Sequence, residues 1–189
     1  YGWDFVDDEG DPAPGTGEDS TPDAVTHGTV IAGIAGATGD NGIGINGVAW
    51  NVKLMSVRML DAAGAGDSFT ASDAIDYAVA NGADVINLSF AGELQDPLMR
   101  IAVRDAYRSG TVIVSALGNE NQNTDSNPVF PACFSNASED WVIGVGASTK
   151  SDDKSEFSNY GEECVDISAP GEGIFGLAYQ DDSGDYDDY

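Results

Sequence analysis

Two residues have side chains suited to acid–base and electrostatic catalysis, His27 and Asn119. His27 is the only histidine in the sequence, and imidazole, with an ordinary pKa of about 6.5, both accepts and donates protons near neutral pH. Asn119 follows Gly118 at the expected end of a buried apolar strand, where a polar side chain could reach the surface. A lone histidine is also commonly structural, and Gly-Asn is common in turns. Taken singly, each residue leaves the structural interpretation open.

An acidic segment near the N-terminus offers oxygen ligands for a hard cation. It contains Asp4, Asp7, Glu9 and Asp11, with Gly10 permitting a sharp turn. Carboxylates at such spacing suit Ca²⁺, which takes about six to eight oxygen ligands at about 2.3 to 2.6 Å. A solvated acidic loop without any ion fits the same residues.

Alternating helices and apolar strands are predicted to position these side chains. We expect surface loop over 1–26 and a glycine-rich loop over 39–47. The predicted helices cover 30–35, 70–81 with Gly82 as a stop, and 97–109 with Asp96 as N-cap and Gly110 behind it. The predicted strands cover 52–60, 84–90, 111–117, 141–147 and 164–168. Near-continuous apolar strands separated by helices indicate an α/β fold with a mostly parallel sheet and helices on both faces.

The strand ends indicate where the working groups should lie. Parallel sheets place such groups beyond the carboxyl ends of their strands. Two predicted strands end at Ser89–Gly92 and at Leu117–Asn119. We therefore expect these two corners to be neighbours.

Composition and charge limit the classes of partner. The chain has 189 residues, with 33 Asp and Glu against 7 Lys and Arg and a formal charge of -26. Such a charge repels nucleic acid and anionic bilayers, and no apolar run approaches the ~18 residues of a membrane span. The apolar fraction of 41% is too high for a disordered acidic tail. We predict one globular domain over 1–189, with a surface that suits saline or cation-rich water.

Five segments, in order along the chain, resemble motifs of the subtilisin-like serine proteases (subtilases). They are His27–Thr29 with the small-residue helix after it, Asp84–Ser89, Ser115–Asn119, Phe157–Gly161 and Ser168–Gly171. The opening Gly2–Val6 also resembles a segment that precedes the histidine in several secreted members. Although each motif is short, five matches in family order make the resemblance specific. It implies a three-layer subtilisin-like α/β fold and a serine endopeptidase that cleaves peptide bonds by acyl transfer.

The resemblance assigns roles to individual residues. His27 would be the general base that takes a proton from a serine hydroxyl, and Asn119 the side-chain donor to the oxyanion. A polypeptide substrate would pair with the chain as an added β-strand, and such backbone pairing accepts many substrate sequences. Small side chains beside Phe90 would leave room for a large apolar residue of the substrate. The residues implied to bind substrate are Ala65, Gly66, Asp67, Ser89, Phe90, Ala91, Ser115, Ala116, Leu117 and Gly118.

The resemblance also implies structural Ca²⁺. Some subtilases bind calcium in the segment that matches Gly2–Val6, which favours the metal interpretation of the acidic segment. Asp40 and Asn41, with the carbonyl oxygens of Ile43 and Ile45, resemble a second calcium loop.

The two cysteines give information on the cellular compartment, because a disulfide between them would need an oxidising environment. Cys133 and Cys164 lack CxxC spacing, and by themselves they fit either a disulfide or two buried thiols. By the resemblance, their segments run side by side. A bridge would contribute about 3 to 4 kcal/mol and needs an oxidising compartment, so we expect an extracellular protein.

The sequence departs from the family at two of the three triad positions. The family order is Asp, His, Ser, but no Asp-Thr/Ser-Gly motif precedes His27 and no Gly-Thr-Ser motif follows it. Ser183 lies at roughly the family distance, but the aspartates around it would oppose an oxyanion, so we do not assign it. We expect residues 1–189 to be inactive alone, with the rest of the same protease chain as a partner. The alternative is a non-catalytic subtilase-like binding or structural protein in a larger assembly.

Overall fold

The computed structural model describes residues 2–14, 22–136 and 138–177. The chain divides into two compact units, one of Tyr1–Thr70 with Gly173–Tyr189 and one of Ala71–Glu172. Each unit is described by itself, and the single domain expected over 1–189 stays a prediction. Ser183 lies outside the described residues.

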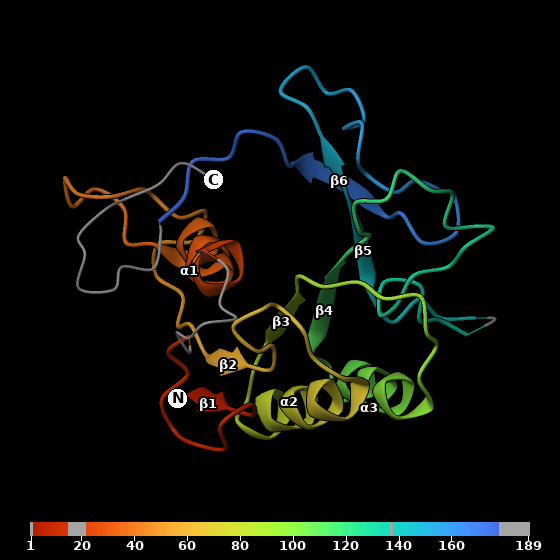
Figure 1. Cartoon of the computed structure of the whole chain (residues 1–189), viewed down its shortest axis with the longest axis horizontal. Coiled ribbons are helices and arrows are strands. Elements are labelled where there is room, and N and C mark those ends of the chain that lie inside the picture. Colours follow the sequence, from red (N-terminus) through yellow and green to blue (C-terminus); the bar gives the residue numbers. More distant parts are fainter. Residues whose placement is uncertain (1, 15–21, 137, 178–189) are drawn as a thin grey trace. The chain divides into compact units, whose positions relative to one another are not determined.

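The first unit contains helix α1 (Pro22–Gly36) and two short strands, β1 (Gly2–Asp4) and β2 (Ser56–Arg58), shown in Figure 1. The two strands pair in parallel, with Gly2 opposite Ser56. The expectation of surface loop over 1–26 is therefore wrong for β1 and for the start of α1. Because α1 begins at Pro22, which suits the first turn of a helix, His27 lies inside the helix and not before it.

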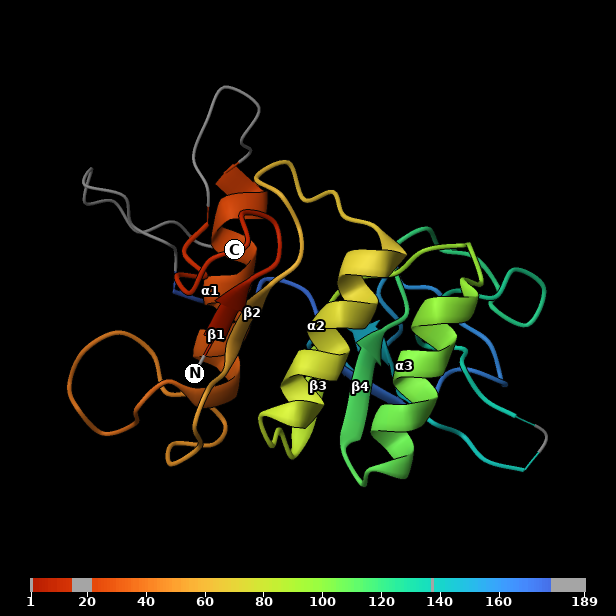
Figure 2. The same ribbon diagram turned by 90° about the horizontal axis from the view of Figure 1, so that it is seen from below.

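The second unit is built on a four-stranded sheet. Its strands are β3 (Val85–Leu88), β4 (Val112–Ala116), β5 (Ile143–Ser148) and β6 (Ile167–Pro170), in the order β3-β4-β5-β6. Every neighbouring pair in this sheet is parallel. Helices α2 (Ser68–Ala80) and α3 (Pro97–Arg108) lie side by side over β3 and β4, as Figures 1 and 2 show. Parallel strands linked by helices confirm the predicted α/β class.

Local chemistry sets the ends of the helices as predicted. The Asp96 carboxylate accepts hydrogen bonds from the backbone N–H groups of Leu98 and Met99, at 2.8 and 3.2 Å, so it is the N-cap of α3. Gly82 follows α2 with φ of 80° and Gly110 follows α3 with φ of 88°, a backbone conformation that glycine adopts at little cost.

Burial alternates along the strands of the second unit. Ile86 and Leu88 in β3 are buried, and so are Ile113 and Ser115 in β4, whereas Val85 is exposed. Successive strand side chains point to opposite faces, so one face of the sheet forms the core.

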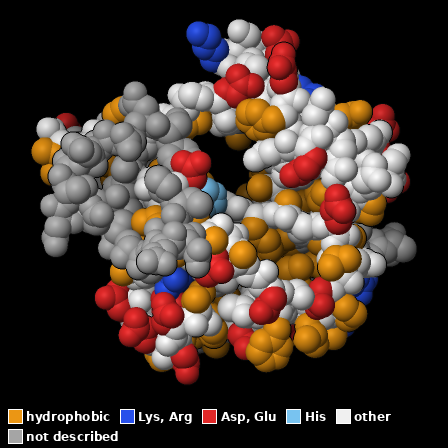
Figure 3. Space-filling view, in the orientation of Figure 1, with side chains coloured by type: hydrophobic (Ala, Val, Ile, Leu, Met, Phe, Trp, Pro, Cys, Tyr) orange, Lys and Arg blue, Asp and Glu red, His pale blue; other side chains and the backbone are white. Residues whose placement is uncertain are grey.

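Acidic side chains are scattered over the face shown in Figure 3, with few basic ones among them. This distribution agrees with the net charge of -26. Among the described helices, none has both the length and the apolar character that crossing a membrane requires.

Candidate active site

Asn119 lies just beyond the carboxyl end of β4, where the chain turns from the core to the surface. Leu117 is 1% exposed, whereas Asn119 is exposed. Gly118 between them has φ of 90°, which side chains rarely adopt. A Cβ at Gly118 would also lie 2.6 Å from Glu120 Oε2 and 2.8 Å from Asn159 Nδ2. Both backbone conformation and space therefore require glycine before Asn119.

The ends of β3 and β4 are neighbours, which confirms that part of the prediction. Leu88 in β3 lies opposite Ser115 of the parallel strand β4. Beyond these residues, a Cβ built on Gly118 would lie 3.4 Å from the Cβ of Ala91. The exposed Ala91 thus stands beside the turn that presents Asn119.

Two contacts fix the segment that leaves β3. The Asn87 side-chain amide donates to Ser89 Oγ at 2.7 Å. Gly92 and Phe130 exchange two backbone hydrogen bonds, at 2.9 and 2.8 Å, in an antiparallel bridge. Phe90 and Ala91 lie between these contacts; their role in substrate binding stays a prediction.

The side chains of residues 115–117 differ in burial. Ser115 and Leu117 are each 1% exposed, and Leu117 packs in a buried cluster with Val129, Ala132 and Cys164. Because side chains alternate along a strand, only Ala116 of the three points to the other face. The side chains of Ser115 and Leu117 are therefore turned inward, while substrate binding by Ser115, Ala116 and Leu117 stays a prediction.

Residues 65–67 are exposed and lie between a turn at 62–63 and the start of α2. Ala65 donates its N–H to Asp61 Oδ1 at 2.9 Å and accepts the N–H of Asp61 at 2.8 Å. Asp67 Oδ1 accepts the N–H of Thr70 at 2.8 Å, and this hydrogen bond lowers the pKa of the Asp67 carboxyl. The carboxylate of Asp67 therefore caps the start of α2, while substrate binding by Ala65, Gly66 and Asp67 stays a prediction.

His27 is half-buried within α1 of the first unit. Burial lowers the pKa of its imidazole below the ordinary 6.5, because desolvation disfavours the charged form. The ring is therefore mainly neutral at pH 7, the form that accepts a proton. Asn119 belongs to the other unit, so the convergence of the two side chains stays a prediction.

The acidic segment is organised around a buried carboxylate, Asp4. Its Oδ1 accepts the N–H groups of Val6 and Asp7, at 2.7 and 3.1 Å. Arg58 in β2 donates to Asp4 Oδ2 at 2.5 Å and to Asp7 Oδ2 at 2.6 Å. Burial raises the pKa of Asp4, but the hydrogen bonds from Asp7, Arg58 and Val6 outweigh it, so this pKa lies below the ordinary 3.8.

Three carboxylates of this segment fit a hard cation. Among the described residues, Asp4, Asp7 and Glu9 form the one group of three possible ligands whose atoms all lie within 4.8 Å of one another. Asp11 is not in the group; its Oδ1 accepts the N–H of Ala13. Arg58 was not predicted from the sequence as part of this site. The signal for it is that the chain has only seven Lys and Arg and that one of them lies in a short strand. Arg58 already supplies positive charge to two of the three carboxylates.

The second predicted calcium loop is exposed and makes local hydrogen bonds. Asp40 has φ of 57° and donates its N–H to Asn46 Oδ1 at 3.2 Å. Asn41 Oδ1 accepts the N–H of Ile43 at 3.1 Å. One predicted ligand oxygen, that of Asn41, is thus already engaged by the backbone.

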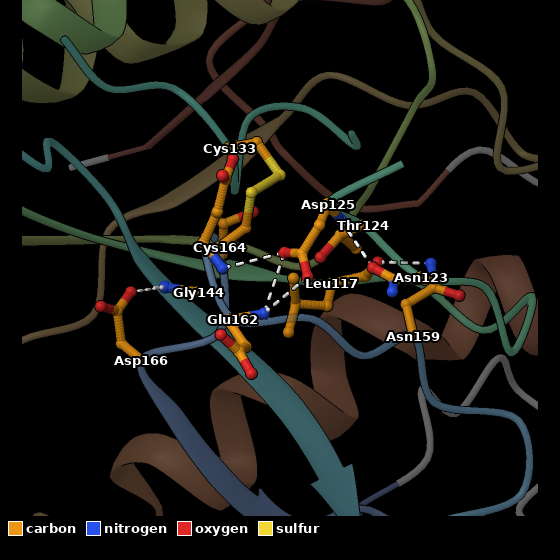
Figure 4. The surroundings of a disulfide bond; sticks show 12 residues. Leu117, Asn123, Thr124, Asp125, Cys133, Gly144, Asn159, Glu162, Cys164 and Asp166 are labelled. Carbon is orange, nitrogen blue, oxygen red and sulfur yellow. Dashed lines mark hydrogen bonds between the residues drawn. A yellow bond between two sulfur atoms is a disulfide. The ribbon is translucent and has the colours of Figure 1, made fainter. Parts of the chain in front are cut away.

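A disulfide joins Cys133 and Cys164, 31 residues apart, with Cα atoms 5.0 Å apart. The predicted bridge is therefore confirmed. Figure 4 shows Asp125 close by, with its carboxylate accepting the N–H groups of Glu162 and Glu163 at 2.9 Å. Disulfide and carboxylate together tie the loop after β4 to the segment before β6.

Comparisons with known proteins identify the family. The model of the subtilase family (peptidase S8) matches residues 3–186. Thermitase of Thermoactinomyces vulgaris is 39% identical over 92% of this chain and 56% of its own. A thermophilic serine proteinase of Bacillus sp. strain AK1 is 41% identical over 90% of this chain and 38% of its own. A crystal structure of a cold-adapted subtilisin-like serine proteinase matches with a TM-score of 0.74 and 32% identity, over 93% of this chain and 57% of that one.

The chain therefore belongs to the subtilase family, and its fold is the subtilisin-like α/β fold. It spans little more than half the length of thermitase and less of the Bacillus proteinase.

Proposed function

We propose that this chain supplies the general base and the oxyanion donor of a serine endopeptidase, which hydrolyses peptide bonds by acyl transfer. The observation that carries the proposal is the turn at Gly118, which brings Asn119 to the surface beside Ala91 at the ends of β3 and β4. This is the sheet edge at which α/β proteins place their reactive groups.

In the proposed reaction, neutral His27 takes the proton of a serine hydroxyl as that oxygen attacks the scissile carbonyl. The imidazolium then returns the proton to the leaving amine. The lowered pKa of His27 favours the first step because the ring is unprotonated at neutral pH. Asn119 donates a carboxamide N–H to the oxyanion of the tetrahedral intermediate. Because residues 1–189 contain neither the Asp nor the Ser motif of the family, we assign those two groups to the rest of the same protease chain.

The proposed substrate is a polypeptide that adds as a strand to Ser89–Ala91 and to Ala65–Asp67. Main-chain hydrogen bonds would give affinity for many sequences. Two observations support the first segment: it is fixed at Ser89 and Gly92, and it lies next to the Gly118 turn.

We propose Asp4, Asp7 and Glu9 as ligands of a structural Ca²⁺. The close grouping of their oxygens supports this, since Ca²⁺ prefers several carboxylate oxygens. Any ion there shares Asp4 and Asp7 with Arg58. The Asp40–Asn41 loop is a second, weaker candidate, because it supplies one carboxylate where the first site groups three.

We also propose that the protein is extracellular. The disulfide supports this, because such bonds persist in oxidising compartments. One relative, 36% identical over 78% of this chain, is the minor extracellular protease Epr of Bacillus subtilis.

Peptide hydrolysis tests the proposed function. In the longest natural chain that contains these residues, Asn119→Ala should lower kcat by about 100- to 1,000-fold, a magnitude known from a subtilisin and not calculated from this structure. Asn127→Ala, an exposed asparagine farther along the same loop, is the matched control and should leave kcat unchanged. An Asn119→Ala protein with an unchanged kcat would contradict the proposal.

A further inference from the structure

Asn159 is a buried polar residue to which neither the family resemblance nor the proposed chemistry gives a role. It is 1% exposed and lies in Phe157–Gly161, a segment between β5 and β6. A buried carboxamide is costly unless its donors and acceptors are all used. The partners of this side chain therefore indicate what it does.

The backbone of this segment runs along the loop that holds Asn119. Asn121 donates its N–H to the carbonyl of Phe157 at 2.7 Å, and Asn159 donates its N–H to the carbonyl of Gly118 at 3.2 Å. Tyr160 donates its N–H to the carbonyl of Gln122 at 3.0 Å. The two segments are thus joined before the Asn159 side chain is considered.

The Asn159 side chain makes four further hydrogen bonds, all to the same loop. Oδ1 accepts the N–H groups of Glu120 at 3.2 Å and Gln122 at 2.9 Å. Nδ2 donates to the carbonyl of Leu117 and to Glu120 Oε2, both at 2.7 Å. A carboxamide has two donor and two acceptor positions, so all four are used, on both sides of Asn119.

The Gly118 turn fits around this carboxamide. A Cβ on Gly118 would lie 2.8 Å from Asn159 Nδ2, so the close approach of the Asn159 side chain depends on glycine there. Asn159 also holds the Glu120 carboxylate through Nδ2. That contact fixes the direction of a negative charge one residue from Asn119, where a free carboxylate could approach and oppose an oxyanion.

We propose that Asn159 is a positioning residue that holds the Leu117–Gln122 loop so that Asn119 presents its carboxamide to the oxyanion. This inference rests on the proposed role of Asn119. Asn159 does not touch the substrate; it acts through Asn119. Since a misplacement of about 1 Å can cost about 100-fold in rate, loss of Asn159 should lower kcat with little change in KM.

A double-mutant cycle on peptide hydrolysis, in the longest natural chain that contains these residues, tests the proposal. The variants are Asn159→Ala, Asn119→Ala and the double variant, each assayed at a temperature where circular dichroism shows it folded. We expect Asn159→Ala alone to lower kcat by about 10- to 100-fold. In the Asn119→Ala background, the same substitution should lower kcat by less than about twofold, because the group it positions is gone.

A matched control separates positioning from general loss of stability. Thr111→Val removes a hydrogen bond of 3.2 Å from the buried Thr111 hydroxyl to the carbonyl of Ala83, at the opposite end of β4. It should leave kcat unchanged in both backgrounds. If Asn159→Ala does not fold, Asn159→Ser serves in its place, since it removes the carboxamide, keeps a small polar group and adds no charge; the same pattern is expected.

The outcomes distinguish the two claims. Equal effects of the Asn159 substitution with and without Asn119, or no effect on kcat at all, would overturn the positioning role. If Asn119→Ala itself leaves kcat unchanged, the proposed function fails as well.

Discussion

The two units each bury a polar side chain at a critical turn, but the chemistry differs. In the first unit the buried group is the carboxylate of Asp4, which Arg58 neutralises. In the second it is the neutral carboxamide of Asn159, satisfied by four hydrogen bonds to one loop. A buried charge needs a counter-charge, whereas a buried amide carries no charge and needs only hydrogen-bond partners. The uncharged carboxamide of Asn159 therefore suits a loop whose Asn119 is proposed to stabilise a developing negative charge.

The largest effect expected from this contrast concerns Arg58. Its side chain is 11% exposed and that of Asp4 is 1% exposed, so Arg58→Met leaves a buried carboxylate without its counter-charge. We expect the free energy of unfolding to fall by about 3 to 5 kcal/mol, measured by urea denaturation. The control is Arg104→Met, which breaks a more exposed pair with Asp105 and should cost less than about 1 kcal/mol. Equal losses of unfolding free energy in the two variants would contradict the expected difference between a buried and an exposed ion pair.

The second unit is expected to depend on its disulfide. Replacing Cys133 and Cys164 together by serine opens a loop of 31 residues and should lower the free energy of unfolding by about 3 to 4 kcal/mol in the chain-entropy model. Reductant should lower the stability of the parent protein to the same value. The double-serine variant should not respond to reductant, and a response would show that the loss has another cause.

Acid should weaken the first unit through Asp4. The pKa of Asp4 is lower in the folded protein than its ordinary 3.8, so its stabilising contribution is fully present above that pH. The contribution is lost as pH falls through the lowered folded pKa, because the folded state then takes up protons less readily than the unfolded chain. Asp4→Asn should show a shallower loss of stability between pH 4 and pH 2, followed by denaturation at a series of pH values. An unchanged slope would mean that other carboxylates dominate acid unfolding.

The smallest expected effect has the opposite sign. Burial, with Asp73 and Asp105 nearby, raises the pKa of Asp76 in α2, so its ionised form destabilises the fold at neutral pH. Asp76→Asn should therefore stabilise the protein at pH 7, by about 0.2 to 0.5 kcal/mol after allowance for solvent screening of an exposed group. The gain should shrink in high salt and vanish at pH 3. A loss of stability at pH 7 would contradict the assigned repulsion.

The helix ends and the adjacency of two consecutive parallel strands were predictable from the sequence. The Asp96 cap, the Gly82 stop and the adjacent ends of β3 and β4 follow from helix-end chemistry and from apolar strands in a parallel sheet. The disulfide was predictable only with the family resemblance, since the spacing of Cys133 and Cys164 alone also fits two free thiols.

Side-chain hydrogen bonds between residues far apart in the chain were not predictable. Arg58 reaches Asp4 over 54 residues, and Asn159 reaches Leu117 over 42. Nothing local in either segment specifies such a partner. The inward direction of Ser115 and Leu117 was missed for another reason. The residues of β4 are mostly apolar on both faces, so the sequence shows no alternation of apolar and polar residues from which the core face can be identified.

A crystal structure of the longest natural chain, solved after labelling with a fluorophosphonate, would show whether His27 and Asn119 act on the same acyl group. We expect a phosphonyl group on a serine outside residues 1–189, with its oxygen accepting a hydrogen bond from Asn119 Nδ2 and the His27 imidazole in contact with the labelled serine. An adduct that neither side chain approaches, or one formed on a serine within residues 1–189, would contradict this expectation.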